Sequence, residues 1–148
     1  MKCKMTGICD SMENKLSNLK DLPPLAMRLV LAYGFWTTGT MKWSGIENVA
    51  TWFESMGYPF PLLNAYMAAT TEVIGAVLLL LGFATRMISI PLIIIMLVAI
   101  FTVHISSGFE AGNNGFEIPL YYLIMLFALF VTGPGRISLI GLIKKFQN

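Results

Sequence analysis

The chain has 148 residues, of which 56% are hydrophobic and 12% are charged, and its formal net charge at pH 7 is +2. A soluble domain carries about 25% charged residues, so this chain has too little polar material to cover a water-facing surface. The composition therefore excludes an ordinary soluble domain and predicts an integral membrane protein. The small net charge gives no indication of nucleic-acid binding.

Residues 1–22 are polar and contain no apolar region of the kind found in a cleavable signal. We expect them to form a cytoplasmic tail, and residues 23–146 to form one membrane domain. The tail holds both cysteines, Cys3 and Cys9. Their thiols are weak candidates for copper(I) ligands, while reduced cysteines in a cytoplasmic tail usually have no such role.

Four apolar segments follow the tail and are predicted to cross the membrane. They cover residues 23–41, 61–83, 87–106 and 117–132. Each is close to the ~20 residues that a helix needs to cross a hydrocarbon core of ~30 Å. The predicted fold class is therefore all-α, an integral membrane four-helix bundle.

Lysine and arginine are concentrated on one side of this predicted bundle. That side holds Lys2, Lys4, Lys15, Lys20, Arg86, Arg136, Lys144 and Lys145, whereas the other side holds Lys42 alone. Because positively charged loops stay in the cytoplasm, we expect both termini there, and loops 42–60 and 107–116 outside. The first outer loop has apolar residues at helical spacing, which predicts a helix lying in the membrane interface. Residues 137–146 predict a short amphipathic segment on the cytoplasmic surface.

Glu72 lies inside the second predicted span, roughly 16 Å from its outer end at ~1.5 Å per residue. A charged residue at this depth costs about 2.5–3.5 kcal/mol, so it is expected to be neutralised, paired or used in function. The simplest pairing is with Arg28 in the first span, because Lys42 lies at the outer boundary and is expected to be too far away. The alternative is a protonated, neutral carboxyl. An Arg28–Glu72 pair could simply fix helix packing, or Glu72 could relay a proton while Arg28 orients a ligand.

Other candidate residues lie toward the outer side. His104 could bind a metal or accept a proton, although a histidine at the end of a span is more often only an interfacial residue. Met41 and Met56 would add soft ligands for copper(I), but no close spacing joins them to His104. The predicted polar site thus comprises Arg28, Lys42, Glu72 and His104, and opens outward.

Several motifs together resemble the DoxX family of small four-helix bacterial membrane proteins. They are Arg28, GTMK (39–42), TEVIGAVLLLLGFATR (71–86) and GPGRISL (133–139). The resemblance covers residues 24–139, and its most specific feature is Glu72 followed by Gly75, by Leu81-Gly82 and by Thr85-Arg86. The run from GFATR to His104 is most similar to the HvfX-type branch, which is associated with biosynthesis of copper-binding modified peptides. The family often has an aspartate where this chain has Ile140, so no role of that aspartate is carried over.

The resemblance implies an inner-membrane component of a redox or copper-handling pathway that acts with partner proteins. Some members resemble subunits of a thiosulfate:quinone oxidoreductase, so copper and quinone are the candidate cofactors. The alternative is a small transporter or membrane scaffold with no chemistry of its own, and the sequence leaves open whether the protein is an enzyme. A stripe of small residues in the second span permits a homo-oligomer without requiring one.

Overall fold

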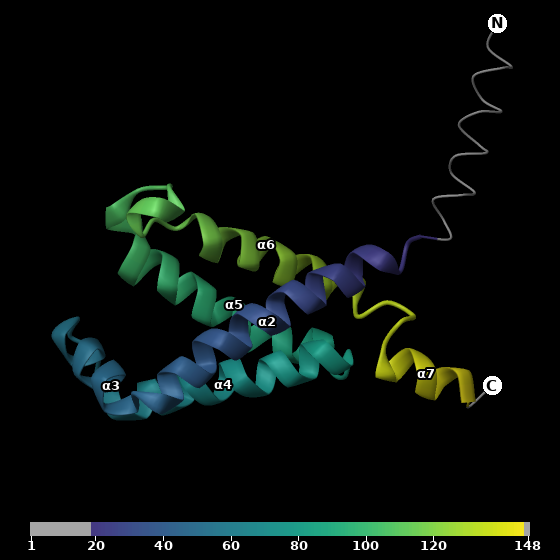
Figure 1. The fold of residues 1–148 in the computed structure, drawn as a ribbon, viewed down its shortest axis with the longest axis horizontal. Coiled ribbons are helices and arrows are strands. Elements are labelled where there is room, and N and C mark those ends of the chain that lie inside the picture. The colour runs from purple at the N-terminus through teal and green to yellow at the C-terminus, as the bar shows by residue number, and fades with distance from the viewer. Residues whose placement is uncertain (1–18, 147–148) are drawn as a thin grey trace, which may run out of the picture.

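The computed structural model describes residues 19–146 and shows only helices and loops within that range (Figure 1). The elements in chain order are α2 (Leu22–Ser44), α3 (Ile46–Ser55), α4 (Pro61–Leu81), α5 (Thr85–Val98), a π-helical stretch η1 (Ala99–His104), two 3₁₀ turns η2 (Ile105–Ser107) and η3 (Ala111–Asn113), α6 (Glu117–Thr132) and α7 (Leu139–Phe146). The prediction of an all-helical fold is confirmed for this part of the chain. Cys3 and Cys9 lie outside the described residues.

The long helices pack as two pairs. Helix α2 lies along α4, and α5 lies along α6, while contacts of α4 with α5 and of α2 with α6 join the pairs. Helix α3 packs against α4 at one end of the molecule, and α7 lies at the opposite end (Figure 1). We call these the α3 end and the α7 end. Helices α3 and α7 occupy the two segments for which the sequence predicted short helices.

Two helical segments within residues 19–146 are long and apolar enough to cross a membrane. They are Pro61–Leu81 and the continuous run Thr85–Ser107, in which α5 passes directly into η1 and η2. Glu117–Thr132 is also apolar but shorter. Large apolar side chains also cover much of the outer surface, among them Leu29, Leu80, Ile124 and Phe127. A surface of this kind is suited to lipid rather than to water.

The core lies where the two helix pairs meet. Its buried residues are Leu31, Ala32, Phe35, Ala76, Leu79, Leu92, Met96, Leu126 and Leu129. Small residues of α4 such as Ala65, Ala69 and Ala76 are buried within the chain. They therefore serve close packing inside this molecule, as small residues do between helices in lipid.

Helix α4 ends at Gly82, which has a left-handed φ of +65°. Its backbone N–H donates to the carbonyls of Leu78 and Leu79, as in a common helix ending. A side chain at this position would collide with the guanidinium of Arg28 and with Ser138. Glycine is thus favoured here both by its backbone angle and by the close approach of the Arg28 guanidinium and Ser138.

Candidate functional site

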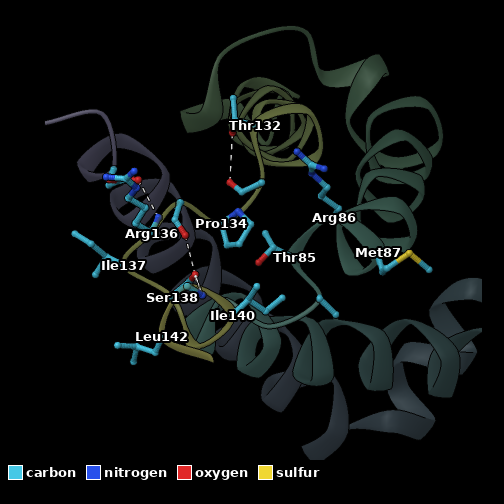
Figure 2. A pocket seen from close by; sticks show the side chains of 15 residues that line it. Thr85, Arg86, Met87, Thr132, Pro134, Arg136, Ile137, Ser138, Ile140 and Leu142 are labelled. Atoms are coloured by element: carbon cyan, nitrogen blue, oxygen red, sulfur yellow. Dashed lines mark hydrogen bonds between the residues drawn. The ribbon is translucent and has the colours of Figure 1, made fainter. Parts of the chain in front are cut away.

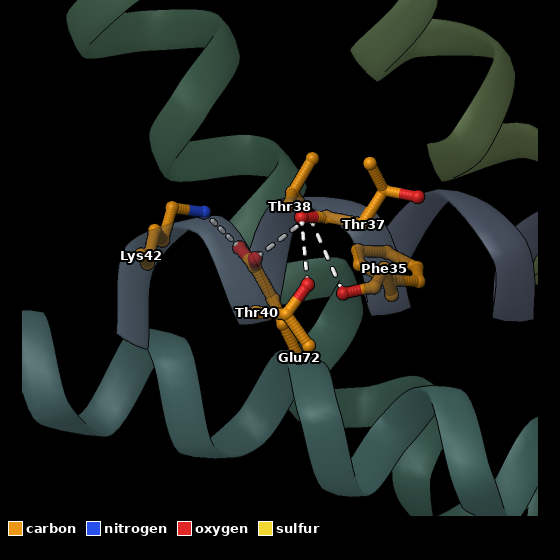
Figure 3. A network of polar contacts seen from close by, with 6 residues as sticks. All are labelled: Phe35, Thr37, Thr38, Thr40, Lys42 and Glu72. Carbon is orange, nitrogen blue, oxygen red and sulfur yellow. Dashed lines mark hydrogen bonds and ion pairs between the residues drawn. The ribbon is translucent and has the colours of Figure 1, made fainter. Parts of the chain in front are cut away.

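The Glu72 carboxylate is held by two side chains of α2. Lys42 forms an ion pair with Oε1, and the Thr38 hydroxyl donates to Oε2 at 2.8 Å (Figure 3). The Glu72 side chain is 1% exposed, whereas that of Lys42 is 23% exposed. A carboxylate buried in apolar surroundings is therefore compensated by a cation that still contacts the surface.

The predicted Arg28–Glu72 pair is wrong. Arg28 is 1% exposed and donates to the backbone carbonyl of Ile137 and, at 3.5 Å, to that of Leu79. It therefore ties α2 to the last turn of α4 and to the segment that precedes α7. Arg28 stabilises the α7 end, and Lys42 takes the role at Glu72 that the sequence assigned to Arg28.

The direction of the side chains explains this difference. Side chains on an α-helix lean toward its N-terminus. On α2, both Arg28 and Lys42 therefore lean toward the α7 end. This lean brings the Lys42 ammonium closer to Glu72 and moves the Arg28 guanidinium away from it. Glu72 leans toward the start of α4, which lies at the α3 end, and so reaches toward Lys42.

Gly39 sets the register of the two helices. A Cβ at this position would lie 2.9 Å from Val73 Cγ2 and 3.1 Å from Glu72 Cβ. The backbone of α2 therefore touches α4 beside Glu72, one turn before Lys42. At this separation the lysine side chain is long enough to reach the carboxylate.

A pocket of about 720 Å³ lies beside the ion pair. Its walls come from α2, α3, α4, α5 and η1, together with parts of the loops after α3 and η3. Aromatic and aliphatic side chains such as Trp52, Phe53, Ile94 and Val98 form most of the surface. The pocket is thus apolar, with one carboxylate and one ammonium in its wall.

The structure brings together several of the predicted site residues in this pocket. Met41, Lys42, Glu72 and His104 all line it, whereas Arg28 and Met56 do not. Nδ1 of His104 lies 2.7 Å from the Asn114 carbonyl oxygen, which links η1 to the loop before α6. Among residues 19–146 there is no cluster of three or more His, Cys, Asp or Glu side chains able to hold a metal.

Sequence reasoning missed other residues of the site. Thr38 lies four residues before Lys42, on the same face of α2, and this spacing could have identified it. Met67 and Thr71 of α4 also line the pocket, and the Tyr58 hydroxyl donates to Thr102 at 2.8 Å across its wall. Tyr58 lies between α3 and α4, and Thr102 in η1, so no local pattern connects them.

Apolar helices, an outer surface suited to lipid and a buried ion pair beside an apolar pocket are the features of a helical membrane protein. The model of the DoxX family matches residues 24–105. The chain belongs to the DoxX family. The match includes both the Lys42–Glu72 pair and the pocket-lining helices α4 and α5.

Curated relatives extend this similarity over most of the chain. An uncharacterised protein of Haemophilus influenzae is 33% identical over 97% of this chain and 91% of its own length. The putative oxidoreductase CatD of Bacillus subtilis is 30% identical over 78% of this chain and 81% of its own. The inner membrane protein YphA of Escherichia coli is 32% identical over 78% and 86%, respectively. No solved structure matches the chain significantly.

Proposed function

We propose that the protein crosses the bacterial inner membrane four times, through α2, α4, α5 with its η extensions, and α6. The charge distribution supports an orientation with the α7 end in the cytoplasm. Among the described residues that end carries Lys20, Arg86 and Arg136, whereas Lys42 is the lone lysine or arginine at the α3 end, beside Glu47, Glu54, Glu110 and Glu117. Positive charge is retained on the cytoplasmic side of membrane proteins.

Within this topology we propose that the protein is the membrane component of a redox pathway and binds a quinone-type molecule in the 720 Å³ pocket. The observation that carries this proposal is the Lys42–Glu72 pair in the wall of an otherwise apolar pocket. Pockets for small ligands are mostly apolar, with a few polar groups that fix the orientation of the ligand. An apolar ring with polar carbonyls is complementary to such walls.

The residues of the pocket can be given roles in this function. The Lys42 ammonium has three donors and engages Glu72, so it can also donate to a ligand carbonyl. Glu72, fixed by Thr38, would receive or deliver a proton at that ligand oxygen. Trp52 and Phe53 would pack against an aromatic ring. A bound quinone would supply a two-electron, two-proton acceptor, and we propose that a partner protein of the pathway delivers the electrons.

One relative supports a redox role. CatD of Bacillus subtilis is named a putative oxidoreductase and aligns with 78% of this chain. The competing proposal, a transporter or scaffold without chemistry, requires neither a ring-binding pocket nor an ionised Glu72. Measuring quinone binding, and how a substitution of Lys42 changes it, therefore distinguishes the redox proposal from the transporter or scaffold proposal.

Quinone binding can be measured by quenching of tryptophan fluorescence with a short-chain quinone, in protein reconstituted in nanodiscs. Trp52 lines the pocket, whereas Trp36 is 50% exposed on the outer surface of α2. We expect saturable quenching in the wild-type protein and in Trp36→Phe, and only the non-saturable component from lipid-dissolved quinone in Trp52→Phe. Lys42→Met should weaken the saturable phase about tenfold, the value of one hydrogen bond to a charged group. Absence of a saturable phase in the wild-type protein would exclude the quinone proposal.

Copper(I) is the second candidate ligand. The thioethers of Met41 and Met67 and the imidazole of His104 all line the same pocket, and these are ligand types that copper(I) accepts. Met56 does not line it, and Cys3 and Cys9 lie outside the described residues. The pocket therefore offers soft ligands but no carboxylate or cysteine cluster around them among residues 19–146.

A further inference from the structure

A second and larger pocket, of about 1090 Å³, lies at the α7 end of the molecule. Figure 2 shows its side chains, which come from the start of α5, the end of α6, the loop after α6 and α7. The pocket shares no residue with the one beside Glu72. In the proposed topology it lies at the cytoplasmic membrane boundary, where lipid phosphates are located.

The first turn of α5 forms part of the wall. Ala84, Thr85, Arg86 and Met87 line the pocket, and no side chain caps this helix end. The backbone N–H of Ile88 donates to the Ala84 carbonyl. The backbone N–H groups of residues 85–87 have no acceptor within the part of the chain that the structure describes. Free amides at a helix N-terminus, together with the helix dipole, attract anions.

An independent observation indicates that a ligand belongs here. Thr85 is 1% exposed, and its hydroxyl has no hydrogen-bond partner in the described chain. Figure 2 shows this hydroxyl pointing inward among the pocket side chains, on the side of Pro134. Buried hydroxyls are normally satisfied, so one without a partner calls for an explanation. The same hydroxyl could donate to an anion placed over the first turn of α5.

The charges around this pocket favour an anion. Arg86 is exposed and uses one nitrogen to donate to the Val131 carbonyl at 3.1 Å, which places its guanidinium at the pocket wall. Arg136 also lines the pocket. Among the described residues that line the pocket, the one carboxylate is that of Asp21, which accepts the backbone N–H of Arg136 at 2.8 Å. Two arginines against one carboxylate leave a net positive charge.

We propose that this pocket binds a phosphate group at the N-terminus of α5, with Thr85 and Arg86 as its side-chain ligands. Guanidinium and backbone N–H donors together suit the several acceptor oxygens of a phosphate. The phosphate could belong to an anionic phospholipid or to a soluble phosphate ester. The two sources share this chemistry and are distinguished by the experiment.

The test uses the full-length protein and has two arms. In the first, native mass spectrometry counts phosphatidylglycerol retained from nanodiscs, with a galactolipid that lacks phosphate as the comparison. In the second, glycerol 3-phosphate is titrated against the melting temperature in lipid-free detergent. A lipid ligand predicts about one retained phosphatidylglycerol and no response to glycerol 3-phosphate. A soluble ligand predicts a concentration-dependent rise in melting temperature.

Thr85→Val is the decisive variant because it removes the hydroxyl and keeps the shape of the side chain. Without ligand, its melting temperature should equal or exceed that of the wild type, since the lost hydroxyl has no partner within the described chain. Its affinity for the phosphate ligand should fall about tenfold. Arg86→Gln should show a similar loss of affinity. If Arg86→Gln fails to fold after losing its hydrogen bond to the Val131 carbonyl, the affinity of Thr85→Val alone tests the phosphate-binding proposal.

Two matched controls complete the design. Thr37→Val removes a hydroxyl that donates to the Tyr33 carbonyl and lies far from the pocket, and Lys20→Gln removes one positive charge at the same end outside the pocket. Both should retain the ligand as the wild type does. Absence of binding in both arms would overturn the proposal, as would equal binding by Thr85→Val and the wild type. Neither result would bear on the quinone proposal.

Discussion

Lys42 and Glu72 form an ion pair between α2 and α4 in which the two partners differ greatly in their access to the surface. The glutamate side chain is 1% exposed and the lysine side chain is 23% exposed. The consequence of removing one charge therefore depends on which partner remains. A lone Lys42 can turn to water, whereas a lone Glu72 stays buried with only the Thr38 hydroxyl.

We therefore predict that Lys42→Met destabilises the protein more than Glu72→Gln does. The first change leaves a buried uncompensated carboxylate and should cost about 3 kcal/mol or more. The second exchanges one hydrogen-bonded group for another and should cost about 1 kcal/mol. Thermal unfolding in detergent measures both, and the double variant should cost less than the sum of the two. Additive effects, or a larger loss in Glu72→Gln, would contradict the pairing.

Gly39→Ala should destabilise the contact between α2 and α4. Its Cβ would lie 2.9 Å from Val73 Cγ2 and 3.0 Å from the Val73 backbone nitrogen, so a helix has to move. Such overpacking costs about 1–3 kcal/mol. Gly112→Ala is the matched control, because nothing lies within 4 Å of a Cβ there. Equal melting temperatures of the two variants would show that the helices separate easily at this point.

Arg28→Met should loosen the segment after α6. The Ile137 carbonyl loses its donor, and the exposed Arg136 next to it becomes a better site for trypsin. A loss of about 1–2 kcal/mol in local stability corresponds to cleavage about 5- to 30-fold faster. Mass spectrometry identifies the Arg136–Ile137 cut, and Thr37→Val, which removes only a hydroxyl that donates to the Tyr33 carbonyl within α2, should leave its rate unchanged. Unaltered cleavage in Arg28→Met would argue against this role of Arg28.

The proposed topology predicts which positions a membrane-impermeant thiol reagent can label in whole cells. Cys3 and Cys9 are first replaced by serine to give a background without thiols. In that background Asn113→Cys, at the α3 end, should be labelled in intact cells. Lys20→Cys, at the α7 end, should be labelled only after permeabilisation, since both positions are exposed but lie on opposite sides. The reverse pattern would invert the proposed orientation.

The copper candidate predicts one equivalent of copper(I) retained by the purified protein after loading and dialysis. His104→Ala should lose it, because His104 lines the pocket, and Met56→Leu should keep it, because Met56 does not. The metal content is measured by mass spectrometry of the digested protein. If the wild-type protein retains no copper, direct copper binding at this site is excluded.

The sequence predicted the helical segments well because each depends mainly on local composition. The fourth predicted span, residues 117–132, coincides with α6, and the second, residues 61–83, differs from α4 by two residues at its end. Glu72 was also identified correctly as a residue that needs an explanation. Its partner Lys42 was not predicted, because an estimate from depth in the membrane ignores the direction in which side chains lean along a helix.

The pocket beside Glu72 was only partly predictable. Lys42, Glu72 and His104 are predicted as site residues from the sequence because polar residues are rare in such segments. Trp52, Met67 and Thr102 are ordinary residues in a membrane protein, and only the fold places them around one cavity. The second pocket was missed for the same reason, since an unsatisfied hydroxyl such as Thr85 is visible only when all its neighbours are known.

The π-helical stretch Ala99–His104 has a consequence for the way His104 reaches its carbonyl partner. An α-helix turns by ~100° per residue, and a π-helical segment usually holds one residue more than regular winding would need. Regular α-helical winding of the same six residues would therefore swing everything beyond them by about 100°. Helix α5 would keep its packing against α6, while the imidazole would rotate off the cavity wall and lose Asn114. The extra residue that the π-helical stretch accommodates thus determines the direction in which the His104 side chain points.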